Sequence, residues 1–493
     1  MKKYFVLLLC LILVLSLAAC NDSDIPEQES AQPQQEAAEL VWYIPCKGLQ
    51  PDMSSVMEAV NDYLMETLGC TLNIIPIEFG NYDQQMQIII SSQKEFDLCF
   101  TSHWCNDFYT NVSRSAFLPL DTLLETHGQA LVQSMPEAGW EAGRVNGVQY
   151  GVPNQQIWAM TNLLQVNKSV LEAYHIHPAS IRTLEDLEPL LAAYKAEHPE
   201  SYPFAIEQEG ALSFNTITMG YDELAGRHVP GVILLEDDSL TVVNQFELPQ
   251  VHDFFRTIYN WCQKGYIRPD SATVNGYVSD FKAGLHVATF DGTYKPTSQE
   301  MNKLTYGCEM EYILLTDSWL TTSGITAAMT AISRTSQHPE LAMELLNLVN
   351  TDPYLYNLIT QGIAGKHYEA LDGTYIRPIE DSGYLPNVDW VFGNQFLAYL
   401  KEGQSADDWI ITQQLNESAT PSPALGFVFD PIPVQDQIAS VTAVLKQYEP
   451  GLSTGVLDPD VVLPEFLKKL DEAGADLIIA EIQQQLDAWA AAN

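Results

Sequence analysis

The sequence predicts an α/β fold with a helical C-terminal region, and three observations carry that prediction. The chain has 493 residues, of which 46% are hydrophobic and 10% aromatic, so it can bury a substantial core. Strand-like and helix-like segments alternate from residue 40 to residue 101. From residue 434 onward, the apolar side chains follow helical spacing.

The first segments alternate between strand and helix. Residues 40–44 are a predicted strand, and residues 51–68 a predicted helix with one apolar face and Gly69 as its stop. A strand at 72–79, a helix at 82–93 and a short strand at 97–101 follow. This order predicts a parallel sheet. In open parallel sheets, ligands bind beyond the carboxyl ends of the strands, where the loop 102–107 would lie.

The later elements follow the same two periodicities. We expect strands at 148–153, 287–290 and 326–332, and helices at 168–174, 184–197, 248–264, 339–350, 434–449 and 464–489. On the last helix, Ile478, Ile482, Leu486 and Trp489 recur at helical spacing, which indicates core packing.

The charge balance excludes one class of partner. Asp and Glu number 64 against 23 Lys and Arg, which gives a formal net charge of −41. A surface this acidic repels phosphate backbones, so nucleic acid is not an expected partner. Anionic lipid headgroups are repelled as well, so attachment to a membrane needs another device.

The first residues supply such a device. Lys2 and Lys3 precede an apolar run at 4–19, which is shorter than the roughly 20 residues of a spanning helix and typical of a signal peptide. The run ends in Leu-Ala-Ala-Cys, which resembles the bacterial lipoprotein signal. That resemblance implies acylation of Cys20; an ordinary signal with an incidental cysteine is the alternative. We therefore expect residues 1–19 to be a signal peptide and residues 20–39 a lipidated cysteine with a flexible tether.

Motifs for catalysis and metal binding were sought next. No GxSxG, HExxH or Walker sequence occurs, and the pairs His103/Cys105 and His175/His177 lack further ligands at metal-site spacing. The sequence therefore predicts neither a metal nor another cofactor. Six cysteines remain once Cys10 in the signal and Cys20 are set aside, and their irregular spacing favours free thiols, with disulfides left open.

Several segments, in their order along the chain, resemble bacterial extracellular solute-binding proteins of the maltodextrin-binding type, which serve ABC importers. These are FDLCFTSHW at 96–104, AFLPLDTLL at 116–124, VNGVQYGVPN at 145–154, DFKAGLHVATFDGTY at 280–294 and AISRTSQHPELAMELLNLVNTD at 331–352. QGIAGKHY at 361–368, FGNQFLAYL at 392–400 and PSPALGFVFDPIPV at 421–434 are similar to a Gram-positive lipoprotein subgroup with a C-terminal domain of unknown function.

This resemblance implies a periplasmic-binding-protein-like type II fold, in which two discontinuous α/β lobes surround a ligand cleft. The expected first lobe is 40–154 plus 319–350, and the second is 155–318 plus 351–417. Residues 418–493 are expected to form a helical region that packs on the lobes. Crossovers between the lobes are expected near 155–160 and 312–318.

The resemblance and the chemistry of sugars together indicate ligand-binding residues. Aromatic rings cover the C–H faces of sugars, and amide and carboxylate groups bind their hydroxyls. Aromatic residues beside polar ones in loops are therefore the candidates, although each of them can instead be a packing residue. The predicted ligand-binding residues are Trp104, Asn106, Asp107, Asn154, Trp158, Asp291, Tyr294, Trp319, Trp390 and Asn394.

The function implied by the resemblance is capture of a small solute, with an oligosaccharide favoured and a peptide possible, and its delivery to the transmembrane subunits of an ABC permease. Such a protein is a monomer, is not an enzyme and is held by its lipid on the extracellular face of the membrane. A secreted carbohydrate hydrolase and a surface adhesion or scaffold lipoprotein are the alternatives. Paired carboxylates, which a glycoside hydrolase needs, are abundant in so acidic a chain.

Overall fold

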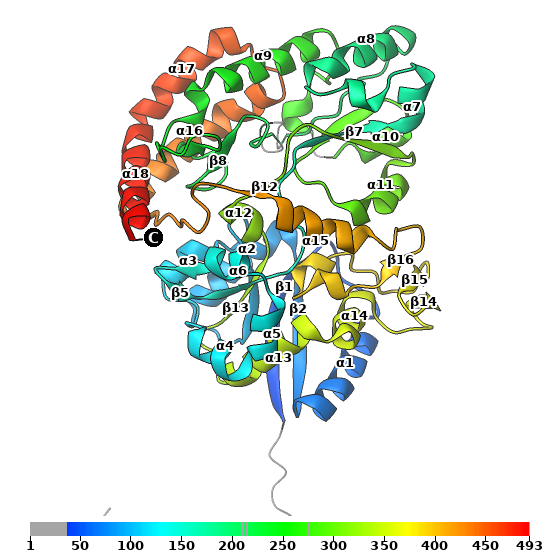
Figure 1. The fold of residues 1–493 in the computed structure, drawn as a ribbon, viewed down its shortest axis with the longest axis vertical. Helices are drawn as coiled ribbons and strands as arrows, with labels where there is room; N and C mark the ends of the chain where they lie inside the picture. The colour runs from blue at the N-terminus through cyan, green and yellow to red at the C-terminus, as the bar shows by residue number, and fades with distance from the viewer. Residues whose placement is uncertain (1–36, 209–211, 213–214, 275, 493) are drawn as a thin grey trace, which may run out of the picture. The chain divides into compact units, whose positions relative to one another are not determined.

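The computed structural model describes residues 37–208, 212, 215–274 and 276–492 (Figure 1). Residues 38–493 form one compact unit, and the description below concerns that unit. The predicted signal peptide and Cys20 lie outside the described residues. Within the described part of the chain, no helix combines the length and the apolar character needed to cross a membrane.

The first lobe is built on a five-stranded sheet in the order β2-β1-β3-β13-β6. Its strands are β1 (Ala38–Cys46), β2 (Cys70–Glu78), β3 (Leu98–Thr101), β6 (Gly151–Pro153) and β13 (Met329–Ile332). Strand β1 is parallel to β2 and β3, which confirms the predicted parallel start. Strand β13 is antiparallel to both β3 and β6, so the late segment expected at 326–332 returns to the middle of the first sheet.

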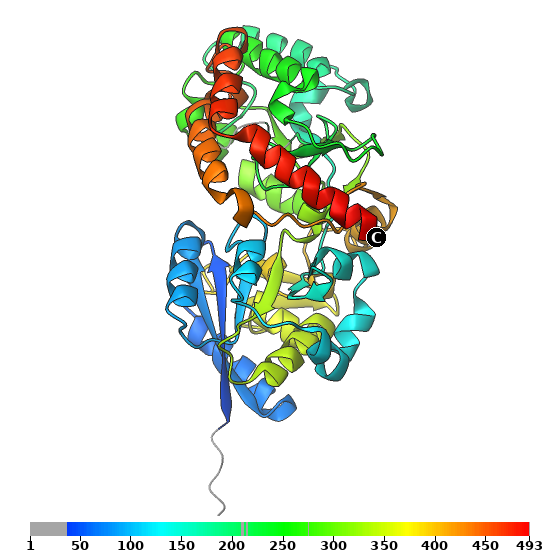
Figure 2. The same ribbon diagram turned by 90° about the vertical axis from the view of Figure 1, so that its left-hand side faces the viewer.

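Helices cover both faces of this sheet (Figures 1 and 2). Helix α1 packs on β2 and α14, α2 on β1 and β2, and α13 on β13, α4 and α5. The helices of the first lobe are α1 (Met53–Thr67), α2 (Phe79–Ser91), α3 (Phe108–Ser113), α4 (Asp121–His127), α5 (Gln129–Ser134), α6 (Glu137–Ala142), α13 (Pro339–Thr351) and α14 (Pro353–Gln361).

The second lobe is built on an antiparallel sheet in the order β10-β7-β11. Its strands are β7 (Leu163–Asn167), β10 (Ala288–Asp291) and β11 (Met310–Leu314), with a hairpin of β8 (Tyr221–Glu223) and β9 (Val232–Leu234) beside it. Its helices are α7 (Lys168–Ala173), α8 (Glu188–Glu197), α9 (Pro249–Gln263), α10 (Val278–Lys282) and α11 (Gln299–Tyr306).

The C-terminal region adds α16 (Gln435–Ser453), α17 (Pro459–Glu472) and α18 (Ala475–Ala492) to the second lobe. Helices α16 and α17 pack against α9, as Figure 1 shows in orange and red. The single helix expected at 464–489 is two helices, because Gly474 adopts a left-handed conformation with φ +97° and the chain changes direction there (Figure 2). The predicted stripe of Ile478, Ile482 and Leu486 is fully buried, and Trp489 packs against the same core.

Shorter elements complete the fold. The strands are β4 (Arg144–Val145), β5 (Val148–Gln149), β12 (Trp319–Leu320), β14 (Tyr368–Asp372), β15 (Tyr375–Pro378), β16 (Leu400–Lys401) and β17 (Thr420–Pro421), and the helices are α12 (Thr322–Ile325) and α15 (Asp408–Ser418). The 3₁₀ turns are η1 (Pro178–Ser180), η2 (Glu185–Leu187), η4 (Gln245–Glu247), η5 (Ser271–Thr273), η6 (Pro296–Ser298), η7 (Asp389–Val391), η8 (Gln395–Leu397) and η9 (Ile432–Val434). Pairing of β12 with β17 joins the return to the first lobe with the approach to the C-terminal helices.

Two large apolar cores correspond to the two lobes. The first core holds residues from β1 through Ala159 and again from Leu320 to Ala419, whereas the second begins at Leu164 and includes the C-terminal helices. The placement of residues 351–417 in the second lobe is therefore wrong: Tyr356, Ile359 and Val391 are buried in the first core. The C-terminal helices likewise contribute to the second core rather than packing on both lobes.

Candidate functional site

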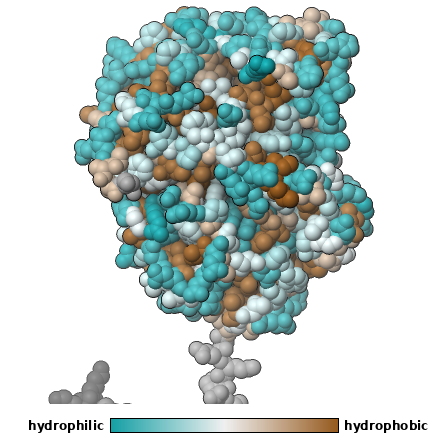
Figure 3. All heavy atoms as spheres, in the orientation of Figure 1, coloured by the Kyte–Doolittle hydropathy of each residue, from teal (hydrophilic) through white to brown (hydrophobic). Residues whose placement is uncertain are grey.

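A cavity of about 570 Å³ is lined by residues of both lobes, and its volume lies within the roughly 300–1,000 Å³ of small-molecule sites. The first lobe contributes His103, Trp104, Asp107, Tyr109, Trp158 and the segment 321–324. The second lobe contributes Tyr221, Asp222, Glu223, Arg227, Thr293, Lys295, Phe427, Phe429 and Ile438. Elsewhere, apolar patches interrupt a largely hydrophilic surface (Figure 3).

Trp104 is the exposed aromatic residue of the cavity wall, with 43% of its surface accessible. It follows β3, as expected for a residue beyond the carboxyl end of a parallel strand. Its indole N–H donates to the Ala327 carbonyl at 2.8 Å, which fixes the orientation of the ring. Phe79 stacks on Trp104 with centroids 6.2 Å apart. Trp104 therefore offers a supported apolar surface.

Trp390 lies behind this surface rather than in the cavity wall. Its ring is half-buried and lies 6.2 Å from the Trp104 ring and 5.9 Å from the Phe79 ring, with which it stacks. The structure thus places Trp390 as a support for Trp104.

In the loop after β3, two neighbouring residues were predicted to bind the ligand, and only one of them lines the cavity. Asp107 lines the cavity and caps α3, where its Oδ1 accepts from the Thr110 N–H at 2.8 Å. Burial raises the pKa of this carboxyl. Asn106 is buried with φ +49°, and its amide donates to the Phe100 carbonyl at 2.8 Å. Asn106 therefore shapes the loop and does not line the cavity.

Of the two predicted residues at the crossover, Trp158 lines the cavity and Asn154 does not. Trp158 lines the cavity, yet it is only 3% exposed and its indole N–H donates to the Asn154 carbonyl at 2.9 Å. Asn154 lies outside the wall, and its side-chain amide donates to the Val391 carbonyl at 2.7 Å. Asn154 holds the crossover against the turn that contains Trp390.

The remaining predicted residues do not form part of the wall. Asp291 accepts from the Gln165 side chain at 2.6 Å, and the Tyr294 hydroxyl accepts from Gln299 at 3.3 Å. The backbone of Trp319 pairs with that of Met160, and the Asn394 amide donates to the Asn350 carbonyl at 3.2 Å. These four side chains lie next to cavity-lining segments and are not brought to the cavity.

The second-lobe wall contains residues that sequence reasoning missed. Asp222 is 5% exposed and accepts from the Ser422 hydroxyl at 2.6 Å. Burial raises the pKa of Asp222 to about 7. Across the cavity, burial lowers the pKa of His103 to about 4, so its imidazole is neutral at physiological pH. No local motif marks Asp222, because the short strands of its hairpin carry no periodic pattern.

A charged cluster connects the cavity with the C-terminal helices. His228 Nδ1 lies 3.4 Å from Glu223 Oε1, and His228 Nε2 lies 4.0 Å from Glu449 Oε1 of α16. Burial opposes both charges of the first pair, but their hydrogen bond and mutual attraction prevail, so the pKa of Glu223 is lowered and that of His228 raised. Burial raises the pKa of Glu449. The cluster therefore ties the wall at Glu223 to α16.

The described residues contain no group of three or more His, Cys, Asp or Glu side chains placed to hold a metal ion. The six described cysteines, which are Cys46, Cys70, Cys99, Cys105, Cys262 and Cys308, are free thiols. The arrangement pairs a fixed aromatic surface with carboxyl and cationic groups, which suits the binding of a ligand that has apolar faces and polar edges.

The described residues thus form two lobes, each with its own sheet and core, around a cavity of the size that small ligands occupy. Residues 423–491 match a family model described as a domain of unknown function, DUF3502. The chain is 28% identical over 497 residues to a carbohydrate ABC transporter substrate-binding protein of Streptococcus pneumoniae serotype 4 (strain ATCC BAA-334 / TIGR4), covering 99% of this chain and 98% of the relative.

Solved structures agree with that relationship. The N-glycan transport solute binding protein (NgtS) of Streptococcus pneumoniae has a TM-score of 0.83 and 26% identity, with coverage of 92% of this chain and 98% of that one. NgtS in complex with Man5GlcNAc has a TM-score of 0.74 and 27% identity, with the same coverage. An extracellular solute-binding protein of Bifidobacterium longum subsp. infantis shares the fold, with a TM-score of 0.64, 15% identity and coverage of 92% and 98%.

The resemblance to extracellular solute-binding proteins of ABC transporters is therefore confirmed, as is the C-terminal domain of unknown function. The type II α/β fold with a helical C-terminal region is confirmed as well. Over nearly its whole length, the chain is similar to a carbohydrate ABC transporter substrate-binding protein.

Proposed function

We propose that this protein captures an oligosaccharide in the cavity between its lobes and delivers it, unaltered, to an ABC importer. The observation that carries the proposal is the cavity itself: the supported, exposed ring of Trp104 faces a space that also holds Asp107, Asp222 and Lys295. An aromatic platform with hydrogen-bonding groups around it matches the apolar faces and hydroxyl rim of a sugar.

The ligands of the similar protein NgtS indicate which oligosaccharides to test first. NgtS is named as an N-glycan transport protein and has been solved with Man1GlcNAc and Man5GlcNAc. Because the likeness to NgtS extends over 92% of this chain, a mannose-rich oligosaccharide that ends in N-acetylglucosamine is the first ligand to test.

The proposal also assigns a location to the protein. Acylation of Cys20 would hold the protein on the extracellular face of the membrane, because the acidic body is repelled by anionic headgroups. Residues 20–39 would then be the tether between the lipid and the lobes. The partner would be the membrane-spanning permease of an importer, with the binding protein acting as a monomer.

Isothermal titration with Man5GlcNAc, followed by mass spectrometry of the recovered sugar, tests the proposal. We expect one equivalent to bind and to be recovered intact. Recovery of shortened glycan would identify a hydrolase instead. Absence of binding to Man5GlcNAc, to the fructan kestose and to alginate oligomers would favour a scaffold without a small ligand.

A further inference from the structure

The loop after β10 places a cationic side chain in the cavity wall. Lys295 lines the cavity next to Thr293 and is half-buried. Among the residues that the structure describes, none accepts a hydrogen bond or ion pair from its ammonium group. An ammonium group has three donors, and those of Lys295 are left for water or a ligand.

The carboxylate whose charge acts on this ammonium, that of Asp291, is bonded to other groups. Asp291 is already engaged by the Gln165 amide at 2.6 Å and by the Thr293 N–H at 3.2 Å. Burial lowers the pKa of Lys295; the charge of Asp291 offsets that effect in part, and the charge of Lys47 adds to it. A partly buried ammonium group without an acceptor is stabilised when a ligand atom accepts its hydrogen bonds.

The loop that carries Lys295 is held at both ends. The Asn162 amide donates to the Gly292 carbonyl at 3.3 Å, and the Gln404 amide donates to the Thr297 carbonyl at 2.6 Å. A site that is fixed before binding costs less ordering when the ligand arrives.

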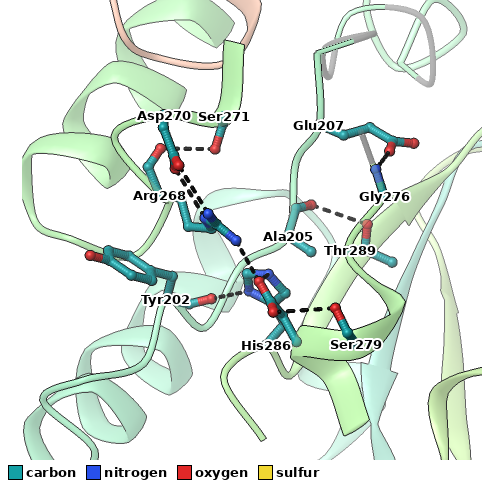
Figure 4. Close-up of polar contacts among 11 residues, drawn as sticks. Tyr202, Ala205, Glu207, Arg268, Asp270, Ser271, Gly276, Ser279, His286 and Thr289 are labelled. Carbon is teal, nitrogen blue, oxygen red and sulfur yellow. Dashed lines mark hydrogen bonds and ion pairs between the residues drawn. The ribbon is translucent and has the colours of Figure 1, made fainter. Parts of the chain in front are cut away.

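The start of β10 is fixed as well, by the cluster in Figure 4. Arg268 contacts Asp270 and Asp280, and the Thr289 hydroxyl donates to the Ala205 carbonyl at 3.1 Å. His286 is 2% exposed and its Nδ1 contacts the Tyr202 carbonyl. These contacts hold the strand that leads to Lys295.

The charges in the same cavity decide which acceptor suits Lys295. Three carboxyl residues, Asp107, Asp222 and Glu223, share the wall with the two cationic residues Arg227 and Lys295. Because carboxyls outnumber cations here and the whole chain carries a formal charge of −41, an anionic ligand is disfavoured. Among neutral groups of sugars, the amide carbonyl of an acetamido substituent carries more negative charge than a hydroxyl oxygen. A hydrogen bond from a cation to such an oxygen is stronger than one between neutral groups.

We propose that Lys295 donates a hydrogen bond to the acetamido carbonyl oxygen of an N-acetylated sugar unit in the ligand. The proposal rests on the proposed function and assigns one residue to the selection of N-acetylated oligosaccharides. Lys295 would thus discriminate such ligands from sugars that carry only hydroxyl groups.

The test compares Lys295→Met with Lys446→Met in the full-length protein by isothermal titration. Lys446 is an exposed lysine of α16 that does not line the cavity, so it is the matched control and should bind all probes as the wild type does. The probes are Man5GlcNAc, the same mannose pentasaccharide without N-acetylglucosamine, and an alginate oligomer. We expect Lys295→Met to weaken Man5GlcNAc binding about 10- to 100-fold and to change binding of the mannose-only sugar less than about threefold.

Equal loss for both mannose sugars, or no loss for either, overturns the proposal. Tighter binding of the alginate oligomer by the wild type, abolished in Lys295→Met, overturns it in favour of an anionic ligand. If the wild type binds none of the three probes, the proposed oligosaccharide function fails instead. Thermal melts without ligand check folding. Should Lys295→Met melt early, Lys295→Gln, which keeps a donor but not the charge, should weaken Man5GlcNAc binding alone and by less than Lys295→Met; an equal change for both mannose sugars in Lys295→Gln would again overturn the proposal.

Discussion

Trp104 and Trp390 show how two tryptophans that both qualify as ligand-binding candidates take different roles. The ring of Trp104 is exposed to the cavity, whereas the ring of Trp390 supports it from the core side. Removal of an exposed ring costs contact with a ligand, while removal of a supporting ring also costs packing.

We therefore expect Trp104→Ala to weaken oligosaccharide binding by about 1–3 kcal/mol while leaving the melting temperature of the free protein almost unchanged. Titration calorimetry and thermal melts measure the two effects. Trp140→Ala is the control, because Trp140 is a half-buried tryptophan of the first lobe that does not line this cavity. Unchanged affinity in Trp104→Ala would exclude this ring from the site.

For Trp390→Ala we expect both a lower melting temperature and weaker binding, because Phe79 and Trp104 lose their neighbour. Melts and titrations of this variant, run beside Trp104→Ala, check the difference. A loss of affinity with no loss of stability would place Trp390 in contact with the ligand, as the sequence analysis proposed.

Asp222 makes the stability of the protein depend on pH. Its pKa rises from the ordinary 3.8 to about 7 because the side chain is buried, so between these values the folded state holds a proton that the unfolded state releases. The free energy of unfolding contributed by this group therefore falls as pH rises from about 4 to about 7 and is level above that.

Asp222→Asn keeps the acceptor for Ser422 and removes the titration. We expect the variant to gain stability relative to the wild type on going from pH 5 to pH 8, by at most about 3 kcal/mol. Denaturant unfolding at both pH values gives the difference. Asp238→Asn, at an exposed carboxyl, should show no such pH dependence; an equal response of the two variants would contradict the role of burial.

At the scale of elements, the turn between α16 and α17 is the position in the C-terminal region that leaves least room for a side chain. Gly455 has φ +75°, and a Cβ there would lie 2.4 Å from the Ile258 carbonyl oxygen of α9. Backbone cannot move aside as a flexible side chain can. Gly147 has a similar φ of +79° with open space around it.

Gly455→Ala should therefore destabilise the protein by clearly more than Gly147→Ala, for which the left-handed conformation alone costs about 1–2 kcal/mol. Denaturant unfolding of the two variants isolates the crowding against α9. Equal losses would mean that α9 and this turn are not in close contact.

Periodicity predicted most elements but not how the chain turns between them. Val56 and Leu64 identify α1 because one face of that helix is buried. The break at Gly474 was missed because helical spacing continues through it. Strand-end reasoning found Trp104 and Asp107, since both follow a buried parallel strand, but it could not find Asp222, which lies on a short hairpin with no pattern of its own.

At the scale of the whole molecule, the assignment of segments to lobes depends on contacts between residues far apart in sequence. The return of β13 to the first sheet could be predicted from the family pattern, whereas the packing of Tyr356 and Val391 in the first core could not. Local hydrophobic patterns show that a segment is buried, and they do not show against which partner.

The proposed lipid attachment leads to a prediction for the whole chain. Cys20→Ala should release the protein from the membrane fraction into the medium, because the acidic body has no affinity for anionic lipid. Fractionation of cells with and without detergent measures this. A variant that still requires detergent for extraction would contradict the lipoprotein assignment. Binding of Man5GlcNAc by the released protein should equal that of the wild type.

Phe427, Phe429 and Ile438 line the cavity, and Ile482 of α18 lies against Gly231 in the hairpin that carries Asp222. The last three helices therefore serve two purposes, because they complete the second core and also close one side of the cavity. A protease that removed the chain from residue 427 onward would take away that wall while leaving every first-lobe residue of the cavity in place.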